Sequence, residues 1–166
     1  MQNLMKRYTV INSYIGGSNI LPQTLHGIND LWLNYTTNKF SKEASKNWID
    51  WANHGKTEVV LTGLDHAGLE KMYECFSKFN DIPIVKFNES MEAMNGCCTI
   101  VSFVVSENIV SAGFYARNAR LNPYNIAQEL KNVLIPHCNT DLPDFVLTEE
   151  EIEVVSQIAF LPTVRI

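Results

Sequence analysis

The run from Cys98 to Val105 is the feature of this sequence that most constrains its fold. It is the most apolar of the segments with strand character, and it contains no charged residue. Such a run is typical of a strand at the centre of a sheet, where other elements cover both faces. We therefore expect a layered structure in which helices pack against a sheet.

Six further elements are predicted before this run. β-branched and aromatic residues indicate strands, and apolar residues spaced three and four positions apart indicate helices. The strands are expected at 7–14, 57–62 and 81–87, and the helices at 21–35, 41–52 and 65–79. Pro83 places the third of these strands near an edge of the sheet or at its own start. The element order predicts an α/β domain over residues 1–106, with a small mixed β-sheet of about four strands flanked by helices.

Residues 107–166 are expected to form an acidic helical extension packed on this domain. Asn122 and Pro123 are suited to the N-cap and first turn of a helix that continues to about Leu134. A second helix is predicted to begin at 148–151, where the residues have the pattern of a capping box.

Composition and charge exclude several classes of protein. The chain has 166 residues, of which 46% are hydrophobic, so it can bury the core of one domain. No apolar run approaches the ~20 residues that span a bilayer, and the first residues lack the apolar segment of a signal peptide, so we expect a cytoplasmic protein without a membrane partner. The net charge of −5 argues against a surface coated in basic residues for nucleic acid. Residues 1–56 nevertheless carry six basic and three acidic residues, a surface that could face phosphate or simply be solvated.

No common cofactor or metal motif is present. The chain has no phosphate-binding loop, no dinucleotide fingerprint and no paired Cys/His metal spacing, so neither a cofactor nor a metal is predicted. His137 and Cys138 form a lone adjacent pair, which is weak evidence for a metal. Cys97 and Cys98 are interpreted as small buried residues, with a catalytic thiol as the alternative.

Gln23 and His26 form the polar pair that stands out. They lie three residues apart at the start of the helix that follows the first strand, so helical geometry places both on one face. The same helix end offers free backbone N–H groups to an anion. The pair could belong to a site, or it could be the polar flank of a surface helix.

The run Ser18–Gly27 contains this pair and reads S-N-I-L-P-Q-T-L-H-G, and residues 48–61 then contain tryptophan and glycine before a V-V-L strand. Both features resemble the type 2 peptidyl-tRNA hydrolases. In that family the first strand runs into G-K-x-x-A-Q-x-x-H-A, and a tryptophan and a glycine precede a K-V-V-L strand. Gln23 and His26 match this motif, whereas Asn19 stands where the family has its lysine.

The later motif of the same family is matched only in part. It reads D-A-G-x-T-Q, followed by a glycine and by a threonine that opens the last strand. Gly96 and Thr99 match those last two residues and fix the alignment without gaps. The D, A, G, T and Q positions are then held here by Phe87, Asn88, Glu89, Met91 and Glu92. The resemblance covers about residues 7–105.

The resemblance implies cleavage of the ester that joins a peptide to the ribose of tRNA. Ester hydrolysis needs a group that positions or deprotonates water and a donor or cation that stabilises the oxyanion. In the family the motif lysine, aspartate and threonine are associated with that work, and here those positions hold Asn19, Phe87 and Met91. Losing one electrostatic donor typically costs about 10²–10³ in rate, so little catalysis is expected unless charged neighbours substitute.

The leading hypothesis is a peptidyl-tRNA-hydrolase-like protein with lost or weak catalysis, which binds RNA, a nucleotide or a protein partner. The alternative is an active peptidyl-tRNA hydrolase with a remodelled site, in which Lys86, Glu89 or Glu92 substitutes for the lost groups. The candidate catalytic residues are Gln23, His26, Asn19 and Thr99. The candidate ligand-binding residues are Ser18, Lys86, Asn88, Glu89, Glu92, Arg117 and Arg120.

Partners follow from the same hypothesis. We expect tRNA, another RNA or a nucleotide at the cleft, and a protein partner for the acidic extension, while the resemblance implies a homodimer. Trp32, Trp48 and Trp51 could stack on bases, but their helical spacing favours the core. Arg117 and Arg120, with the aromatic residues beside them, could contact phosphate or join the extension to the domain.

Overall fold

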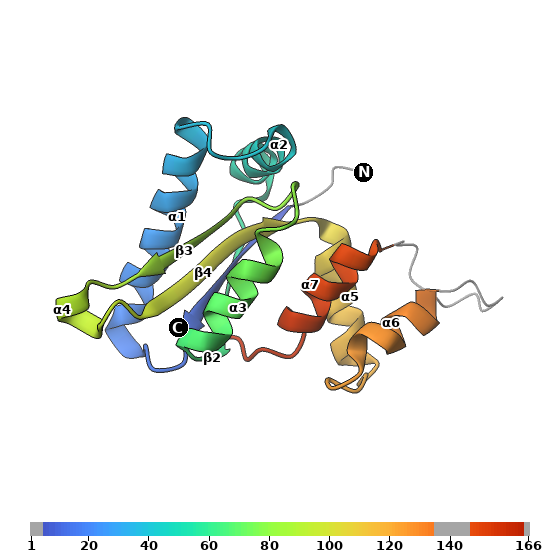
Figure 1. Cartoon of the computed structure of the whole chain (residues 1–166). Helices are drawn as coiled ribbons and strands as arrows, with labels where there is room; N and C mark the ends of the chain where they lie inside the picture. The colour runs from blue at the N-terminus through green and yellow to red at the C-terminus, as the bar shows by residue number, and fades with distance from the viewer. Residues whose placement is uncertain (1–4, 135–146, 165–166) are drawn as a thin grey trace. The chain divides into compact units, whose positions relative to one another are not determined.

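The computed structural model describes residues 5–134 and 147–164, which form an α/β structure (Figure 1). The chain divides into two compact units. The first comprises Met1–Val105 together with Pro162–Ile166, and the second comprises Ser106–Leu161. Within the described residues, no helix combines the length and the apolar character needed to cross a membrane.

The first unit is built around a four-stranded mixed sheet with the strand order β2-β1-β4-β3. Its strands are β1 (Lys6–Asn12), β2 (Glu58–Leu64), β3 (Ile84–Asn88) and β4 (Cys98–Val105). β1 pairs in parallel with β2, and β4 runs antiparallel to both β1 and β3. The small mixed sheet predicted from the element order is therefore confirmed, with β4 in its interior and β3, which follows Pro83, at an edge.

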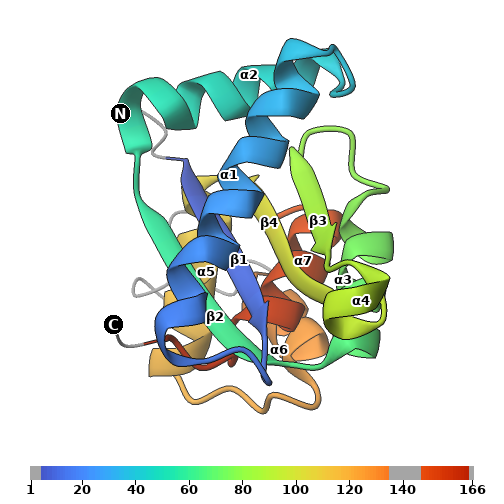
Figure 2. The same cartoon turned by 90° about the vertical axis from the view of Figure 1, so that its left-hand side faces the viewer.

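Helices cover both faces of this sheet. They are α1 (Ile20–Thr36), α2 (Lys42–Asp50), α3 (His66–Phe76) and α4 (Met91–Met94), with a 3-10 helix at Gly17–Asn19 and a π-helix at Trp51–Gly55. Figure 2 shows α1 in front of the sheet, and Figure 1 shows α3 on the opposite side of β4 from α1. All eight residues of β4 are buried, as expected for a strand covered on both faces.

The α1 helix lies unusually close to β4 because of Gly27. A Cβ atom at this position would meet the Cβ atom of Ser102 at 2.8 Å and the side chain of Ile100 at 3.1 Å. On the other face, Phe76 of α3 packs edge-on against Phe103, with 5.1 Å between ring centroids. The close approach of α1 brings the polar residues near its N-terminus within reach of β3 and β4.

The second predicted helix is present and ends in a π-helical turn. Ser41 caps α2 by accepting a hydrogen bond from the backbone N–H of Ala44 at 3.0 Å. After the π-helix the chain turns through Lys56, which has a left-handed backbone (φ 47°). Gly55 is required just before this turn, because a Cβ atom there would stand 2.3 Å from the carbonyl oxygen of Met5.

The described part of the second unit contains α5 (Glu107–Asn118), α6 (Ile126–Leu134) and α7 (Glu149–Ile158). The capping box predicted for α7 is confirmed, since the Thr148 hydroxyl and the Glu151 carboxylate each accept a backbone N–H from the other residue. The predicted start of α6 is wrong. Asn122 accepts N–H groups from Tyr124 (side-chain oxygen, 3.0 Å) and Asn125 (backbone oxygen, 3.0 Å), which closes a turn before the helix. The α5 helix was not predicted.

The end of the described chain belongs to the first unit. The backbone N–H of Thr62 donates to Pro162 and that of Val164 donates to Val60, each at 2.9 Å, on either side of an antiparallel bridge between Leu61 and Thr163. These bonds occupy the outer edge of β2, which would otherwise expose unpaired backbone groups. The sequence-based boundary instead placed all of 107–166 in the extension.

Candidate functional site

Three of the predicted site residues form a hydrogen-bonded chain on the α1 side of the sheet. The Thr99 hydroxyl donates to Gln23 Oε1 at 2.8 Å, and Gln23 Nε2 donates to the Glu89 carboxylate at 2.7 Å. Thr99 is fully buried and Gln23 is 6% exposed, so their polar groups depend on each other for hydrogen bonds. We call Gln23, Thr99 and Glu89, with His26 and Phe87 beside them, the polar cluster.

A register shift places Thr99 in this cluster. Phe87 pairs with Ile100, but Asn88 pairs with Cys98, so Thr99 is an extra residue on β4. A bulge of this kind interrupts the strict alternation of side chains along a strand. The bulge allows the Thr99 side chain to contact Gln23 of α1. Thr99 therefore lies on the same face of the sheet as Ile100, whose side chain lies beside Gly27.

His26 stacks on Phe87. The two rings are almost parallel (2°), with 4.1 Å between their centroids. Phe87 is the residue that the sequence alignment predicts at the position of the family aspartate, and its side chain is an apolar ring in contact with His26. One turn further along α1, burial raises the pKa of Asp30, while His26 and Lys39 oppose this shift. The stack covers a face of the imidazole but not its in-plane nitrogen atoms.

Lys86 and Asn88 do not join the polar cluster, because alternate residues of β3 face α3. The Lys86 ammonium forms an ion pair with Glu70 and lies 5.0 Å from the ring centroid of Tyr73. Asn88 donates to Glu70 at 3.5 Å and to the Gly96 carbonyl at 3.1 Å. The hydrogen bond between Lys86 and Glu70 is the largest cause of a raised pKa for the ammonium and a lowered pKa for the carboxyl.

The remaining candidate site residues of the first unit are exposed, and in the sequence they lie within a few residues of Gln23 or Glu89. Ser18 and Asn19 belong to the 3-10 helix before α1, and both are exposed. Asn19 is the N-cap residue of α1, but its side chain makes no capping hydrogen bond. Met91 and Glu92 begin α4, where both are exposed. Among the predicted carboxylate and lysine substitutes, Glu89 is the one that contacts Gln23.

Arg117 and Arg120 belong to the second unit. Arg117 lies 5.2 Å from the ring centroid of Phe114, and its Nε donates to the Gly113 carbonyl at 3.3 Å. Arg120 is exposed and has a left-handed backbone (φ 53°) just after α5. Of the aromatic–basic grouping predicted from the sequence, Phe114 and Arg117 are in contact on α5, whereas Arg120 follows the end of this helix.

The described residues contain no group of three or more His, Cys, Asp or Glu side chains that could hold a metal ion. His137 and Cys138 lie outside the described residues. Cys98 is fully buried, and burial raises the pKa of its thiol to about 12. A thiol with that pKa stays protonated at neutral pH, which does not suit a nucleophile.

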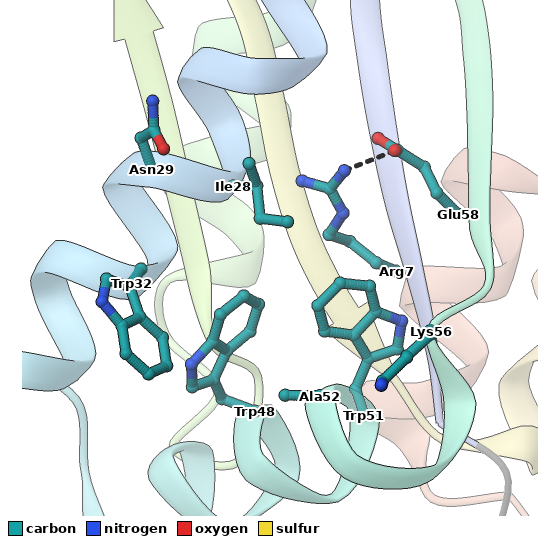
Figure 3. A pocket seen from close by; sticks show the side chains of 9 residues that line it. All are labelled: Arg7, Ile28, Asn29, Trp32, Trp48, Trp51, Ala52, Lys56 and Glu58. Carbon is teal, nitrogen blue, oxygen red and sulfur yellow. Dashed lines mark ion pairs between the residues drawn. The ribbon is translucent and has the colours of Figure 1, made fainter.

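A second feature of the first unit was missed by the sequence analysis. A pocket of about 550 Å³ lies among α1, α2, the π-helix and the first residues of β1 and β2 (Figure 3). We call it the tryptophan pocket, because all three tryptophans of the chain line it. Its lining is Arg7, Ile28, Asn29, Trp32, Trp48, Trp51, Ala52, Lys56 and Glu58.

Arg7 is the unusual residue of this pocket, because it is 2% exposed and charged. It forms an ion pair with Glu58 and lies 5.4 Å from the ring centroid of Trp51. Burial lowers the pKa of its guanidinium, and Glu58 opposes that shift. The signal in the sequence was an arginine and a glutamate at the starts of two strands that pair in parallel, where Arg7 stands opposite Glu58.

No protein-family model matches this chain, and no curated protein matches it. Function therefore has to be inferred from the residues and from their geometry.

Proposed function

We propose that this chain is a peptidyl-tRNA-hydrolase-like protein that binds the terminal ribose of an RNA or a nucleotide and has lost most of that family's catalytic capacity. The polar cluster carries the proposal. Its Gln23, His26 and Thr99 match the motifs of the resemblance, and Gln23 links Thr99 of β4 to Glu89, just after β3, through hydrogen bonds of 2.8 and 2.7 Å. A mixed four-stranded sheet with the predicted element order supports the same resemblance.

The polar cluster offers groups that suit a ribose hydroxyl. One oxygen of Glu89 accepts from Gln23, which leaves its second carboxylate oxygen as an acceptor. Phe87 stacks on the ring face of His26, so this contact does not use the in-plane nitrogen atoms, which can donate or accept. A ribose hydroxyl both donates and accepts, so it can bond to Glu89 and His26 together. The basic excess of residues 1–56 would favour the attached phosphates.

Weak catalysis follows from the composition of the same site. Asn19 carries no charge to stabilise an oxyanion, and Phe87 cannot act as a base toward water. Lys86 is held by Glu70 on the α3 face, so it is not placed to replace the family lysine. We expect the wild-type protein to bind an RNA end without cleaving the ester.

Nucleotide binding tests the proposed ligand. Isothermal titration with AMP and with its 2′,3′-dideoxy analogue should show a preference for the ribose form in the wild-type protein. Glu89→Gln removes the charged acceptor, so we expect about a tenfold loss of AMP affinity and loss of that preference. Glu92→Gln is the matched control, because this carboxylate is exposed on α4. Equal affinity of both nucleotides for the wild-type protein would contradict the proposal.

An active hydrolase is the second candidate, and Glu89 is the observation that favours it. This carboxylate contacts Gln23 two residues after the position of the family aspartate, so it is placed to act as a general base. Under this reading, the protein cleaves N-acetyl-aminoacyl-tRNA, and Glu89→Gln lowers the rate by about 10²-fold or more whereas Glu92→Gln does not. No cleavage by the wild-type protein in excess would exclude it.

Further proposals concern location and assembly. We propose a cytoplasmic location, a homodimer as the resemblance implies, and a protein partner for the acidic second unit. Residues 106–161 carry eight acidic and three basic residues, which suits a basic partner. Sedimentation velocity across a range of protein concentrations tests the homodimer, and a single monomeric boundary throughout would contradict it.

A further inference from the structure

One edge of the four-stranded sheet is covered by the chain itself, and the other is open. Residues 162–164 pair with the outer edge of β2, whereas β3 pairs with β4 and with no other strand of the described residues. Figure 2 shows β2 and β3 at the two sides of the sheet. An open edge presents backbone N–H and C=O groups with which another extended chain can pair.

The strand register identifies the backbone groups of β3 that point away from the sheet. The Val104 N–H donates to the Pro83 carbonyl at 3.1 Å, so these two residues form a hydrogen-bonded pair. In antiparallel strands such pairs alternate with pairs whose backbone groups point outward, so Ile84 and Lys86 direct their N–H and C=O groups to the open side. Within the described residues these groups form no hydrogen bond. We call them the β3 edge.

The Lys86 side chain does not shield this edge. A charged lysine on an edge strand usually disfavours pairing with another strand. Here the Lys86 ammonium is held on the α3 side by its ion pair with Glu70 and by its contact with the Tyr73 ring. The ion pair neutralises the charge, so it does not oppose a strand that pairs with Ile84 and Lys86.

A groove of about 360 Å³ lies beside the first residue of β3. Its lining includes Asn34 of α1, Lys39 and Phe40 after that helix, Tyr73 of α3 and Ile84 of β3, and we call it the edge groove. Because α1 and α3 cover opposite faces of the sheet, a space that both helices line lies at the edge of the sheet. A chain paired with β3 therefore has the edge groove beside it for its side chains.

The edge groove has a positive charge. Among the described residues that line it, Lys39 is the one that is charged, and it is exposed. Lys39 forms no ion pair within the described part of the chain, although its charge acts through space to lower the pKa of Asp30. An acidic side chain in the groove is therefore favoured over a basic one.

We propose that the β3 edge and the edge groove bind an extended, acidic segment of a partner protein. The segment adds a strand antiparallel to β3, which is the more stable arrangement. Its carboxyl end then lies beside Ile84, where an acidic side chain meets Lys39. Main-chain hydrogen bonds supply the affinity, and the groove supplies the specificity. This site uses neither the polar cluster nor the second unit, so it does not depend on the functions proposed for them.

Amide exchange of the full chain, measured by ¹H–¹⁵N NMR, tests the proposal. In the free protein, the amides of Ile84 and Lys86 should exchange at least about tenfold faster than those of Val85 and Phe87, which face β4. The probe is the acetylated and amidated peptide Thr-Val-Thr-Val-Thr-Glu. At saturation it should slow exchange at Ile84 and Lys86 by at least about fivefold.

N-methylated peptides show whether the backbone of the probe is used. Methylation of its threonine amides removes the donors along one side of the extended chain, and methylation of its other amides removes those along the opposite side. Because the contact with Lys39 fixes the register, one of these two peptides should bind at least about tenfold more weakly, and the other should bind like the unmodified probe.

Substitutions locate the acidic end of the probe. Lys39→Gln should weaken binding about two- to fivefold, and it should not affect a probe that ends in glutamine. Lys71→Gln is the control of equal charge change, because this residue is exposed on α3 and does not line the edge groove. Glu89→Gln should not alter probe binding, so failure at the polar cluster and failure at the β3 edge are distinguishable.

Three results would overturn the proposal. The first is slow exchange at Ile84 and Lys86 without the probe, which would show that the edge is not open. If that protection increases with protein concentration, a second copy of the chain occupies the edge instead. The second result is unchanged exchange at both residues up to millimolar probe. The third is equal binding of the unmodified and both N-methylated peptides, which would exclude strand addition.

Discussion

At the scale of single residues, Glu70 and Lys86 show how electrostatics holds β3 against α3. Their ion pair lowers the pKa of the carboxyl and raises that of the ammonium. The Glu70 contribution to stability is present above the pKa of an unfolded glutamate, about 4.3, and is lost as pH falls through the lower folded pKa. The Lys86 contribution is present below about 10.4 and is lost as pH rises through the higher folded pKa.

A substitution of Lys86 should therefore have a pH-dependent effect. We expect Lys86→Gln to lower the free energy of unfolding by roughly 0.5–1 kcal/mol at neutral pH, because both side chains are only partly buried. The loss should shrink as pH falls below the unfolded glutamate pKa of about 4.3 and through the lower folded pKa of Glu70, and the part due to contact with Tyr73 should remain. Urea denaturation at several pH values measures the difference, with Lys71→Gln as the control. A pH-independent loss would show that the charge pair contributes nothing.

Residue-level reasoning located side chains where a local rule applied, and it failed where strand pairing decided their position. Gln23 and His26 were singled out by helical spacing, and both lie in the polar cluster. Thr99 came from the family comparison alone, because a register shift is set by pairing between strands and leaves no local signal. Lys86 was grouped with Glu89. However, Lys86 lies within β3 and Glu89 follows its last residue, so their side chains need not lie on the same face of the sheet.

At the scale of elements, two glycines in helices make a matched test of packing. A Cβ atom at Gly27 would collide with Ser102, whereas a Cβ atom at Gly113 in α5 would meet no atom within 4 Å. Alanine favours a helix by about 1 kcal/mol over glycine, so Gly113→Ala should stabilise the protein by up to that amount. Gly27→Ala should instead destabilise it by roughly 1–2 kcal/mol, because α1 must move away from β4.

Thermal denaturation followed by circular dichroism compares these two variants. The Gly27→Ala variant should also lose AMP affinity, since a shift of α1 separates Gln23 from Thr99 and Glu89. Stabilisation by both substitutions would show that α1 does not depend on the close approach to β4.

The strands and helices of the first unit were predictable because their apolar periods are clear. The second unit was harder. Its α5 helix begins after Ser106 with Glu107 in its first turn, which is an ordinary start signal that the prediction did not use. Asn122 and Pro123 suit both a helix start and a turn, and the hydrogen bond from Tyr124 to the Asn122 side chain stabilises the turn.

At the scale of the whole molecule, residues 162–164 return to the sheet of the first unit after the second unit has ended. Removing residues 162–166 would leave the outer edge of β2 without the bonds that Pro162 and Val164 provide. We expect the amide proton of Thr62 to exchange with solvent at least about tenfold faster in this truncated protein. The amide of Val104, whose partner is Pro83, is the internal control. Unchanged exchange at Thr62 would show that this pairing does not protect the edge.

Neither the tryptophan pocket nor the pairing of residues 162–164 with β2 could be predicted from the sequence. Each depends on which strands become neighbours: Arg7 meets Glu58 only because β1 pairs with β2, and Thr163 meets Leu61 only because that edge is open. The same pairing leaves Arg7 Nε without an acceptor, a cost of about 1–3 kcal/mol that a stable domain offsets elsewhere.

The central claim is that the polar cluster binds an RNA end without cleaving it, and one measurement tests both halves. The protein in excess is mixed with N-acetyl-aminoacyl-tRNA carrying a labelled acyl group, and the retained tRNA and the intact ester are counted on the same filter. We predict retention with the ester intact, and about tenfold weaker retention with Glu89→Gln but not with Glu92→Gln. Release of the labelled acyl group, or equal retention by the wild-type protein and Glu89→Gln, would contradict the claim.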